Sequence, residues 1–190
     1  MTVKKPLIFG LLAGLVALLL FSTYQQQKPY RRSIHNYQVP DVTLLNQRGE
    51  KVPLVAYLQT DKPVLLEFIF TSCTTLCPSM AVKYANFQKR LGADSHRVQL
   101  VSISVDPLVD TPKVINAYLQ RYQAEPGWDF LTGSPQAIKQ VMEVFDISPA
   151  DMITQDASIL LRSPKTGDWV RINGQLSNAD LLHEYQLLEK

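Results

Sequence analysis

Cysteine is scarce in this chain, which has two in 190 residues. Two cysteines are too few for a disulfide-stapled scaffold, so a hydrophobic core must hold the fold together. Net charge is also small, since 19 Lys and Arg stand against 17 Asp and Glu. No basic stripe with interleaved aromatic residues occurs, so we expect no nucleic-acid partner.

Apolar residues, by contrast, are plentiful. They make up 46% of the chain, which is enough to build a sizeable core. The length indicates one domain plus an appendage. No internal repeat or low-complexity tract argues against that division.

The amino terminus carries a long apolar run from Leu7 to Phe21, preceded by Lys4 and Lys5. The run is a little short of the roughly 30 Å hydrocarbon core of a bilayer, but its flanks can extend it. A cleaved signal peptide has a similar apolar length, although no small-residue cleavage site follows the run here. We therefore expect residues 1–24 to be a signal anchor or transmembrane helix.

An anchor so close to the start usually exports the rest of the chain. We expect residues 25–40 to form a polar tether and residues 41–190 to form the domain. That domain would lie in the periplasm, or an equivalent exported space, anchored to the inner membrane. Thiol–disulfide chemistry is permitted there.

Strand-like and helix-like segments alternate beyond the tether. The expected strands are a hairpin over 41–54 and single strands at 63–70, 97–105, 128–132, 157–162 and 169–173. The expected helices are 77–92, 110–122, 134–145 and 177–190. Alternation of this kind implies βαβ units, and a short turn makes the last two strands antiparallel. We predict an α/β, thioredoxin-like three-layer fold with a mixed central sheet flanked by helices.

The two cysteines stand where a strand gives way to a helix. Cys73 follows the strand-like run 63–70, and Cys77 opens the next helix with Pro78 behind it. Free N–H groups at a helix amino terminus stabilise a thiolate, and the four-residue spacing brings both sulfurs to one side. The pair therefore suits either a reversible disulfide or a soft metal ion such as Cu(I). A purely structural disulfide would close a short loop and add only about 2 kcal/mol.

Two acidic residues are further candidates. Glu67 lies inside the buried strand that runs toward the thiols, where a carboxylate is costly unless protonated or paired. It is a candidate proton shuttle with a raised pKa, or else it faces a polar seam or a basic partner. Asp106 ends the next strand, where sites of parallel sheets collect. It could orient the cysteine loop or a partner, whereas turn and capping chemistry suits Asp110 and Thr111 better.

The sequence "FIFTSCTTLCPSM" and, after it, "SISVDPLVDTPKVINAYLQRY" resemble two signatures of the SCO (SCO1/SenC) family. Its members are membrane-anchored, thioredoxin-fold proteins that help to assemble the copper centre of cytochrome c oxidase. With "WDFLTG" and "SPKTGDWVRING", the resemblance spans nearly all of residues 41–175. It implies that Cys73 and Cys77 are a redox-active pair and two of three copper ligands.

The third ligand of the family is a histidine just ahead of the strand that here reads "SILLR". The corresponding region, "MITQDASILLR", has none, and its nearest candidates are Gln155, Asp156 and Ala157. The three histidines of the chain are expected to lie on the surface: His35, His96 and His183.

Loss of the imidazole should weaken Cu(I) binding and disfavour Cu(II), which prefers nitrogen and oxygen ligands. Met80 or Asp156 could supply a weak third contact. We therefore expect an SCO-like assembly factor that works through a dithiol–disulfide couple, with a cytochrome c oxidase subunit or another thiol or copper protein as partner. Two alternatives stay open: a copper metallochaperone with a non-standard third ligand, and a general periplasmic thiol–disulfide reductase.

Overall fold

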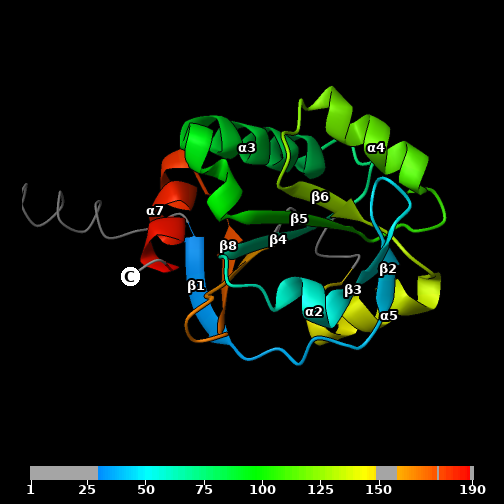
Figure 1. Ribbon diagram of the computed structural model, residues 1–190, viewed down its shortest axis with the longest axis horizontal. Coiled ribbons are helices and arrows are strands. Elements are labelled where there is room, and N and C mark those ends of the chain that lie inside the picture. The colour runs from blue at the N-terminus through cyan, green and yellow to red at the C-terminus, as the bar shows by residue number, and fades with distance from the viewer. Residues whose placement is uncertain (1–29, 149–157, 175, 189–190) are drawn as a thin grey trace, which may run out of the picture.

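The computed structural model describes residues 30–148, 158–174 and 176–188. Its centre is a six-stranded mixed sheet with helices on both faces (Figure 1). The strands, in spatial order, are β1 (Tyr30–His35), β8 (Trp169–Gly174), β7 (Ser158–Arg162), β4 (Val64–Ile69), β5 (Gln99–Ser104) and β6 (Trp128–Leu131). β4, β5 and β6 are parallel, and β7, β8 and β1 each run antiparallel to their neighbour. The predicted mixed sheet is thus confirmed.

Two helical layers enclose this sheet. The helices are α2 (Leu54–Leu58), α3 (Leu76–Leu91), α4 (Pro112–Arg121), α5 (Pro135–Val144) and α7 (Asn178–Leu188), with a 3₁₀ turn η1 (Gly92–Arg97). The predicted hairpin forms a separate small sheet of β2 (Thr43–Leu45) and β3 (Lys51–Pro53). In Figure 1, α3 and α4 lie above the sheet and α2 and α5 below it.

Proline marks the start of two helices, as the sequence predicts. Pro112 opens α4 and Pro135 opens α5, because proline needs no backbone donor in the first helical turn. Ser134 caps α5, since its hydroxyl accepts a hydrogen bond from the backbone N–H of Ala137 at 3.2 Å. Thr111 stands at the N-cap of α4 but makes no side-chain capping bond.

The expectation of a tether over 25–40 is wrong for Tyr30–His35, which forms the edge strand β1 beside β8. An edge strand with mostly exposed side chains can be as polar as a linker, which is why the sequence of β1 resembles one. Tyr30 is its one buried residue, and its hydroxyl donates to Glu184 of α7 at 2.7 Å. The predicted anchor, residues 1–24, lies outside the described residues. Among the helices of the described part, none is long and apolar enough to cross a membrane.

The two faces of the central strands differ in polarity. Side chains alternate along a strand, so Leu66 and Phe68 of β4 pack toward α2 and α5, in one hydrophobic cluster. Leu65 and Ile69 belong to the other cluster, with α3, α4 and α7. We call these the α5 face and the α3 face. On β4 and β5 the buried residues of the α5 face are all apolar, and only the partly buried Gln99 is polar, whereas the α3 face carries three buried polar residues: Glu67, Ser102 and Ser104.

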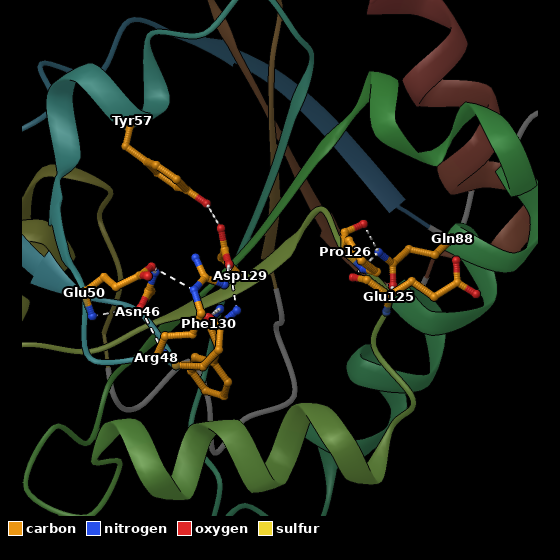
Figure 2. Close-up of polar contacts among 10 residues, drawn as sticks. Asn46, Arg48, Glu50, Tyr57, Gln88, Glu125, Pro126, Asp129 and Phe130 are labelled. Carbon is orange, nitrogen blue, oxygen red and sulfur yellow. Dashed lines mark hydrogen bonds and ion pairs between the residues drawn. The ribbon is translucent and has the colours of Figure 1, made fainter.

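Polar contacts fix the hairpin and α2 against β6 (Figure 2). The carboxylate of Asp129 accepts hydrogen bonds from the hydroxyl of Tyr57 at 2.6 Å and from the amide of Gln47 at 2.7 Å. Gln47 in turn accepts from the backbone N–H of Phe130 at 3.1 Å. Asp129 therefore holds three elements together on the α5 face.

The carboxyl-terminal half of α3 is fixed by one buried amide. Gln88 donates to the backbone carbonyl of Glu125 at 3.0 Å and accepts from its N–H at 3.0 Å (Figure 2). These bonds tie α3 to the loop before β6, so the helix that carries Cys77 is held firmly at its far end.

Removal of one aromatic ring from the α5 face should cost much of the fold's stability. Phe145 is fully buried, and its ring lies 4.9–5.8 Å from those of Tyr37, Phe68 and Trp169. We expect Phe145→Ala to lower the free energy of unfolding by about 3–5 kcal/mol in urea denaturation. The volume-conserving control Leu131→Met should lose less than about 1.5 kcal/mol. Equal losses in both variants would contradict this packing.

Candidate dithiol site

Cys73 and Cys77 meet at the amino end of α3. Cys73 lies in the turn after β4, where its N–H donates to the carbonyl of Phe70 at 3.2 Å. Cys77 is the second residue of the helix, and its backbone N–H donates to the Cys73 sulfur at 3.4 Å. The sulfur therefore accepts from one of the N–H groups that a helix start leaves without an intrahelical partner. This is the side-by-side arrangement that the spacing predicts.

The two thiols differ in access to solvent. Both cysteines are free, with Cys73 half-buried and Cys77 fully buried. Cys77 packs in the hydrophobic cluster of the α3 face, and its carbonyl accepts from the hydroxyl of Tyr118 at 3.2 Å. A partner protein can therefore reach Cys73 but not Cys77.

The same difference appears in the acidity of the thiols. Partial burial alone raises the pKa of Cys73, but hydrogen bonds from Cys77 and Thr75 outweigh it and lower the pKa to about 7. Burial raises the pKa of Cys77 well above its usual range, and its interaction with Cys73 raises it further. Near neutral pH Cys73 is therefore the thiol that ionises, while Cys77 keeps its proton.

Glu67 lies fully buried on the α3 face. One carboxylate oxygen accepts from the hydroxyl of Ser102 at 2.7 Å, and that hydroxyl accepts from the indole N–H of Trp128 at 2.9 Å. The other oxygen is buried and has no hydrogen-bond partner among the described residues. Burial raises the pKa of Glu67 to about 8, and Ser102 and Lys83 only partly oppose this.

The pKa of Glu67 is raised, as the proton-shuttle hypothesis expects, and Glu67 also faces a polar seam, since its hydrogen-bond partner is the Ser102 hydroxyl. Its charge also acts on the site, because negative charge on Glu67 raises the pKa of Cys77. The two groups are thus coupled electrostatically across the α3 face. A catalytic role for Glu67 stays a prediction.

Asp106 follows β5 at the edge where the cysteine turn lies. Its backbone bonds to its neighbours: the N–H donates to Ser104 at 3.0 Å, and the carbonyl accepts from Asp110 at 2.9 Å. Within the described ranges its carboxylate makes no hydrogen bond or ion pair. It borders a groove of about 440 Å³ between the loop after β5 and α5. Its side chain thus makes no hydrogen bond to the cysteine turn among the described residues.

Asp110 contacts the cysteine turn instead. Its carboxylate is fully buried and accepts hydrogen bonds from Thr71 and Ser104. The sequence-based expectation of capping chemistry is wrong for this side chain. A signal was present: "FTSC" and "SISVDPLVD" put hydroxyl residues beside Asp110 once the two strands are paired.

The histidines lie away from the sulfurs. His35 pairs with Trp169, Trp169 with Arg162, and Arg162 with Val64, the first residue of β4. Cys73 lies beyond the other end of β4, which finishes at Ile69. His35 is therefore at the opposite end of the sheet from the cysteines. His96 and His183 are exposed, in η1 and on α7, as expected.

A third copper ligand is not found near the cysteines in the part of the chain that the structure describes. No group of three or more His, Cys, Asp or Glu residues there is arranged to hold a metal ion. Met80, one turn after Cys77, is 2% exposed and packs in the core of the α3 face. The other candidates, Gln155, Asp156 and Ala157, lie outside the described residues.

The dithiol lies at the start of a helix that follows a central strand, in a mixed sheet enclosed by two helical layers. This arrangement defines a thioredoxin-like protein with a CxxxC site. The family follows from comparison with known sequences. The SCO1/SenC family model matches residues 33–162. The chain therefore belongs to the SCO1/SenC family.

Relatives and solved structures agree with this family. The SCO1 protein homolog of Bacillus subtilis is 38% identical over 131 residues, which cover 68% of this chain and 65% of that protein. BsSco, described as a Sco-family cytochrome c oxidase assembly protein with a disulfide switch, superimposes with a TM-score of 0.66 and 30% identity, over 86% of this chain and 97% of that one. Copper-bound ScoI of Arabidopsis thaliana gives a TM-score of 0.60 and 25% identity, over 80% and 96%.

The acidity of Cys73 can be measured directly. We expect alkylation of the reduced chain to modify Cys73, with a rate that rises to half its maximum near pH 7, because the thiolate is the nucleophile. Cys77 should stay unmodified over the same range. Peptide mapping by mass spectrometry identifies the modified residue.

The chain unfolded in urea is the control, and both thiols should titrate there with an ordinary pKa of about 8.5. A folded-state midpoint at that value would contradict the hydrogen-bonded thiolate.

Proposed function

We propose that the chain is an SCO-like assembly factor for the copper centre of cytochrome c oxidase, acting through a Cys73/Cys77 dithiol–disulfide couple. One observation carries the proposal: the Cys77 N–H donates to the half-buried Cys73 sulfur, which is thereby the more acidic thiol. The disulfide switch described for BsSco, 30% identical, supports the redox role.

The exchange reaction follows from the unequal exposure of the two thiols. The Cys73 thiolate attacks one sulfur of a partner's disulfide, forms a mixed disulfide and releases the first partner thiolate. Cys77 then loses its proton and attacks Cys73, which breaks the mixed disulfide and releases the second partner thiolate. Two electrons pass from the dithiol to the partner, whose cysteines are then reduced and free to accept copper.

Glu67 is the proposed proton acceptor in the second half of this reaction. Cys77 is a poor nucleophile while it is protonated, and its raised pKa keeps it so. Glu67 is buried on the same face, has one oxygen without a partner among the described residues, and ionises near pH 8. A base with a pKa close to the working pH suits this transfer.

Copper would be cargo rather than a resident cofactor. Two thiolates are soft donors that suit two-coordinate Cu(I), so the cysteine pair fits that ion. Without an imidazole the binding should be weak. Copper-bound ScoI, 25% identical, supports copper binding by this chain. The alternative of a copper metallochaperone needs a third donor, such as Asp156 or a group from a partner.

Asp106 and the cellular location complete the proposal. The Asp106 carboxylate has no partner among the described residues and borders an open groove, so it is available to a partner protein. That partner would be a cytochrome c oxidase subunit or another thiol or copper protein. We place the domain in the periplasm, or an equivalent exported space, behind an amino-terminal anchor in residues 1–24.

The test combines copper titration with redox equilibrium on the reduced full-length chain. We expect a defined two-electron reduction potential against glutathione, and one-to-one Cu(I) uptake that a chelator readily reverses. Cys73→Ser and Cys77→Ser should each abolish both properties. His35→Ala, at the opposite end of the sheet, is the matched control and should change neither.

Other outcomes separate the alternatives. Tight copper uptake that is lost in Asp156→Asn supports the metallochaperone with a non-standard ligand. A defined potential with negligible copper affinity supports the general thiol–disulfide reductase. Absence of both copper uptake and a two-electron potential refutes the proposed function.

Glu67→Gln should change two pH profiles. The folded-state pKa of Glu67, about 8, lies above its ordinary 4.5, so the folded chain keeps a proton that the unfolded chain has lost. Stability is therefore highest relative to the variant below about pH 4.5 and falls as the pH rises to about 8. The amide introduced by the substitution cannot ionise, so that fall should vanish in urea denaturation. Thiol exchange should also lose its pH dependence near pH 8.

Glu184→Gln is the matched control for Glu67→Gln. Glu184 is another buried carboxylate, but it lies on α7 and binds Tyr30 and Arg32. This control should lose stability without any change in the pH profile of exchange, because Glu184 is bonded to Tyr30 and Arg32 of β1, whereas the thiols lie between β4 and α3. If Glu67→Gln leaves the exchange profile unchanged as well, the proton-acceptor role is excluded.

A further inference from the structure

Asp110 is a fully buried carboxylate in the turn before α4. One oxygen accepts from the hydroxyl of Ser104 at 2.5 Å. The Thr71 backbone N–H donates to the carboxylate at 3.2 Å, and the Thr71 hydroxyl donates to it as well. Three donors thus converge on one side chain from the ends of two neighbouring strands.

These donors satisfy the buried carboxylate of Asp110. A buried carboxylate is costly unless its oxygens are hydrogen-bonded. Within the described residues Asp110 has no ion pair, so its carboxylate oxygens depend on the hydrogen bonds from Thr71 and Ser104. Any movement of the Thr71 segment would leave the carboxylate buried with too few donors.

The position of Thr71 gives these bonds their importance. Thr71 stands two residues before Cys73, in a turn that closes when the Cys73 N–H donates to Phe70. Ser104 is the last residue of β5 and pairs with Ile69, the last residue of β4. Asp110 therefore joins the base of the cysteine turn to the end of the neighbouring strand.

Capping does not account for this side chain. The N-cap of α4 is Thr111, and the Asp110 carboxylate accepts from β5 and from the cysteine turn rather than from α4. The backbone N–H of Asp110 closes the local turn by donating to Asp106 at 2.9 Å. The backbone of Asp110 therefore closes the turn before α4, whereas its side chain bonds to the cysteine turn.

We propose that Asp110 is a positioning residue for the dithiol: it holds Thr71 in place so that the Cys73 sulfur stays on the backbone N–H of Cys77. The inference deepens the proposed function, on which it rests for its biological meaning. Asp110 touches neither sulfur and acts only through the turn. Loss of its second acceptor oxygen should release the turn and weaken the contact between Cys73 and Cys77.

The test is Asp110→Asn, which keeps the shape of the side chain but sets an NH₂ donor against the donors of Thr71 or Ser104. Amide hydrogen exchange reads the contact directly, because the Cys77 N–H is the group that donates to Cys73. We expect this amide to exchange about fivefold faster or more in the variant. Alkylation of Cys73 at neutral pH should slow several-fold, since the sulfur loses a donor that stabilises the thiolate.

Asp129→Asn is the matched control. Asp129 also accepts two side-chain hydrogen bonds, but it lies on the α5 face. It should lose comparable stability while the Cys77 amide and the Cys73 alkylation rate stay unchanged. If both variants affect the cysteines equally, or neither does, Asp110 is only a structural residue and the inference is overturned.

A second pair of variants tests the same inference if Asp110→Asn does not fold. Thr71→Val removes the hydroxyl donor and should produce the same faster exchange at Cys77, whereas Thr71→Ser keeps both donors and should leave it unchanged. Faster exchange in both, or in neither, overturns the inference.

These readouts require neither copper nor a protein partner. If the wild-type chain lacks a two-electron potential and copper uptake, the proposed function fails while the positioning role is still decided by Cys77 exchange. If Asp110→Asn leaves that exchange unchanged, the positioning role fails and the dithiol function is untouched.

Discussion

The hydrogen bond from the Cys77 N–H to the Cys73 sulfur is the contact on which the site depends. It exists because β4 ends and α3 begins within a few residues, so that the turn brings one sulfur onto an open helix end. The strand cannot shift, since it is buried on both faces, and Gln88 anchors the far end of the helix. One rigid junction therefore produces two thiols of the same residue type with different exposure and different acidity.

The sheet supports this junction unequally from its two faces. The face toward α5 is held by hydrocarbon packing around Phe145 and, at β6, by the hydrogen bonds of Asp129 to Tyr57 and Gln47. The face toward α3 contains two hydrogen-bonded groups, Glu67 with Ser102 and Asp110 with Ser104, on the strands that lead to the cysteines. Both of these buried carboxylates thus lie on the side of the sheet that carries Cys77.

Much of this could be predicted from the sequence, because the central elements have strong local signals. The unbroken apolar run of β4, the prolines of α4 and α5, and the cost of burying Glu67 each depend on nearby residues alone. β1 was missed because an edge strand can be polar, and α2 because five residues are too few for a helical period to appear. Asp110 was misread as capping chemistry since its donor Thr71 lies 39 residues away in the chain.

The unequal faces also bear on how sequences of this fold can diverge. Aliphatic and aromatic residues toward α5 can be exchanged one at a time, provided that the total volume is kept. Beneath α3 a single replacement leaves a buried donor or acceptor without a hydrogen-bond partner, so the two partners must change together. Substitutions at Glu67 and Ser102, or at Asp110 and Thr71, should accordingly be inherited as linked pairs, whereas apolar residues of the opposite layer can change one at a time.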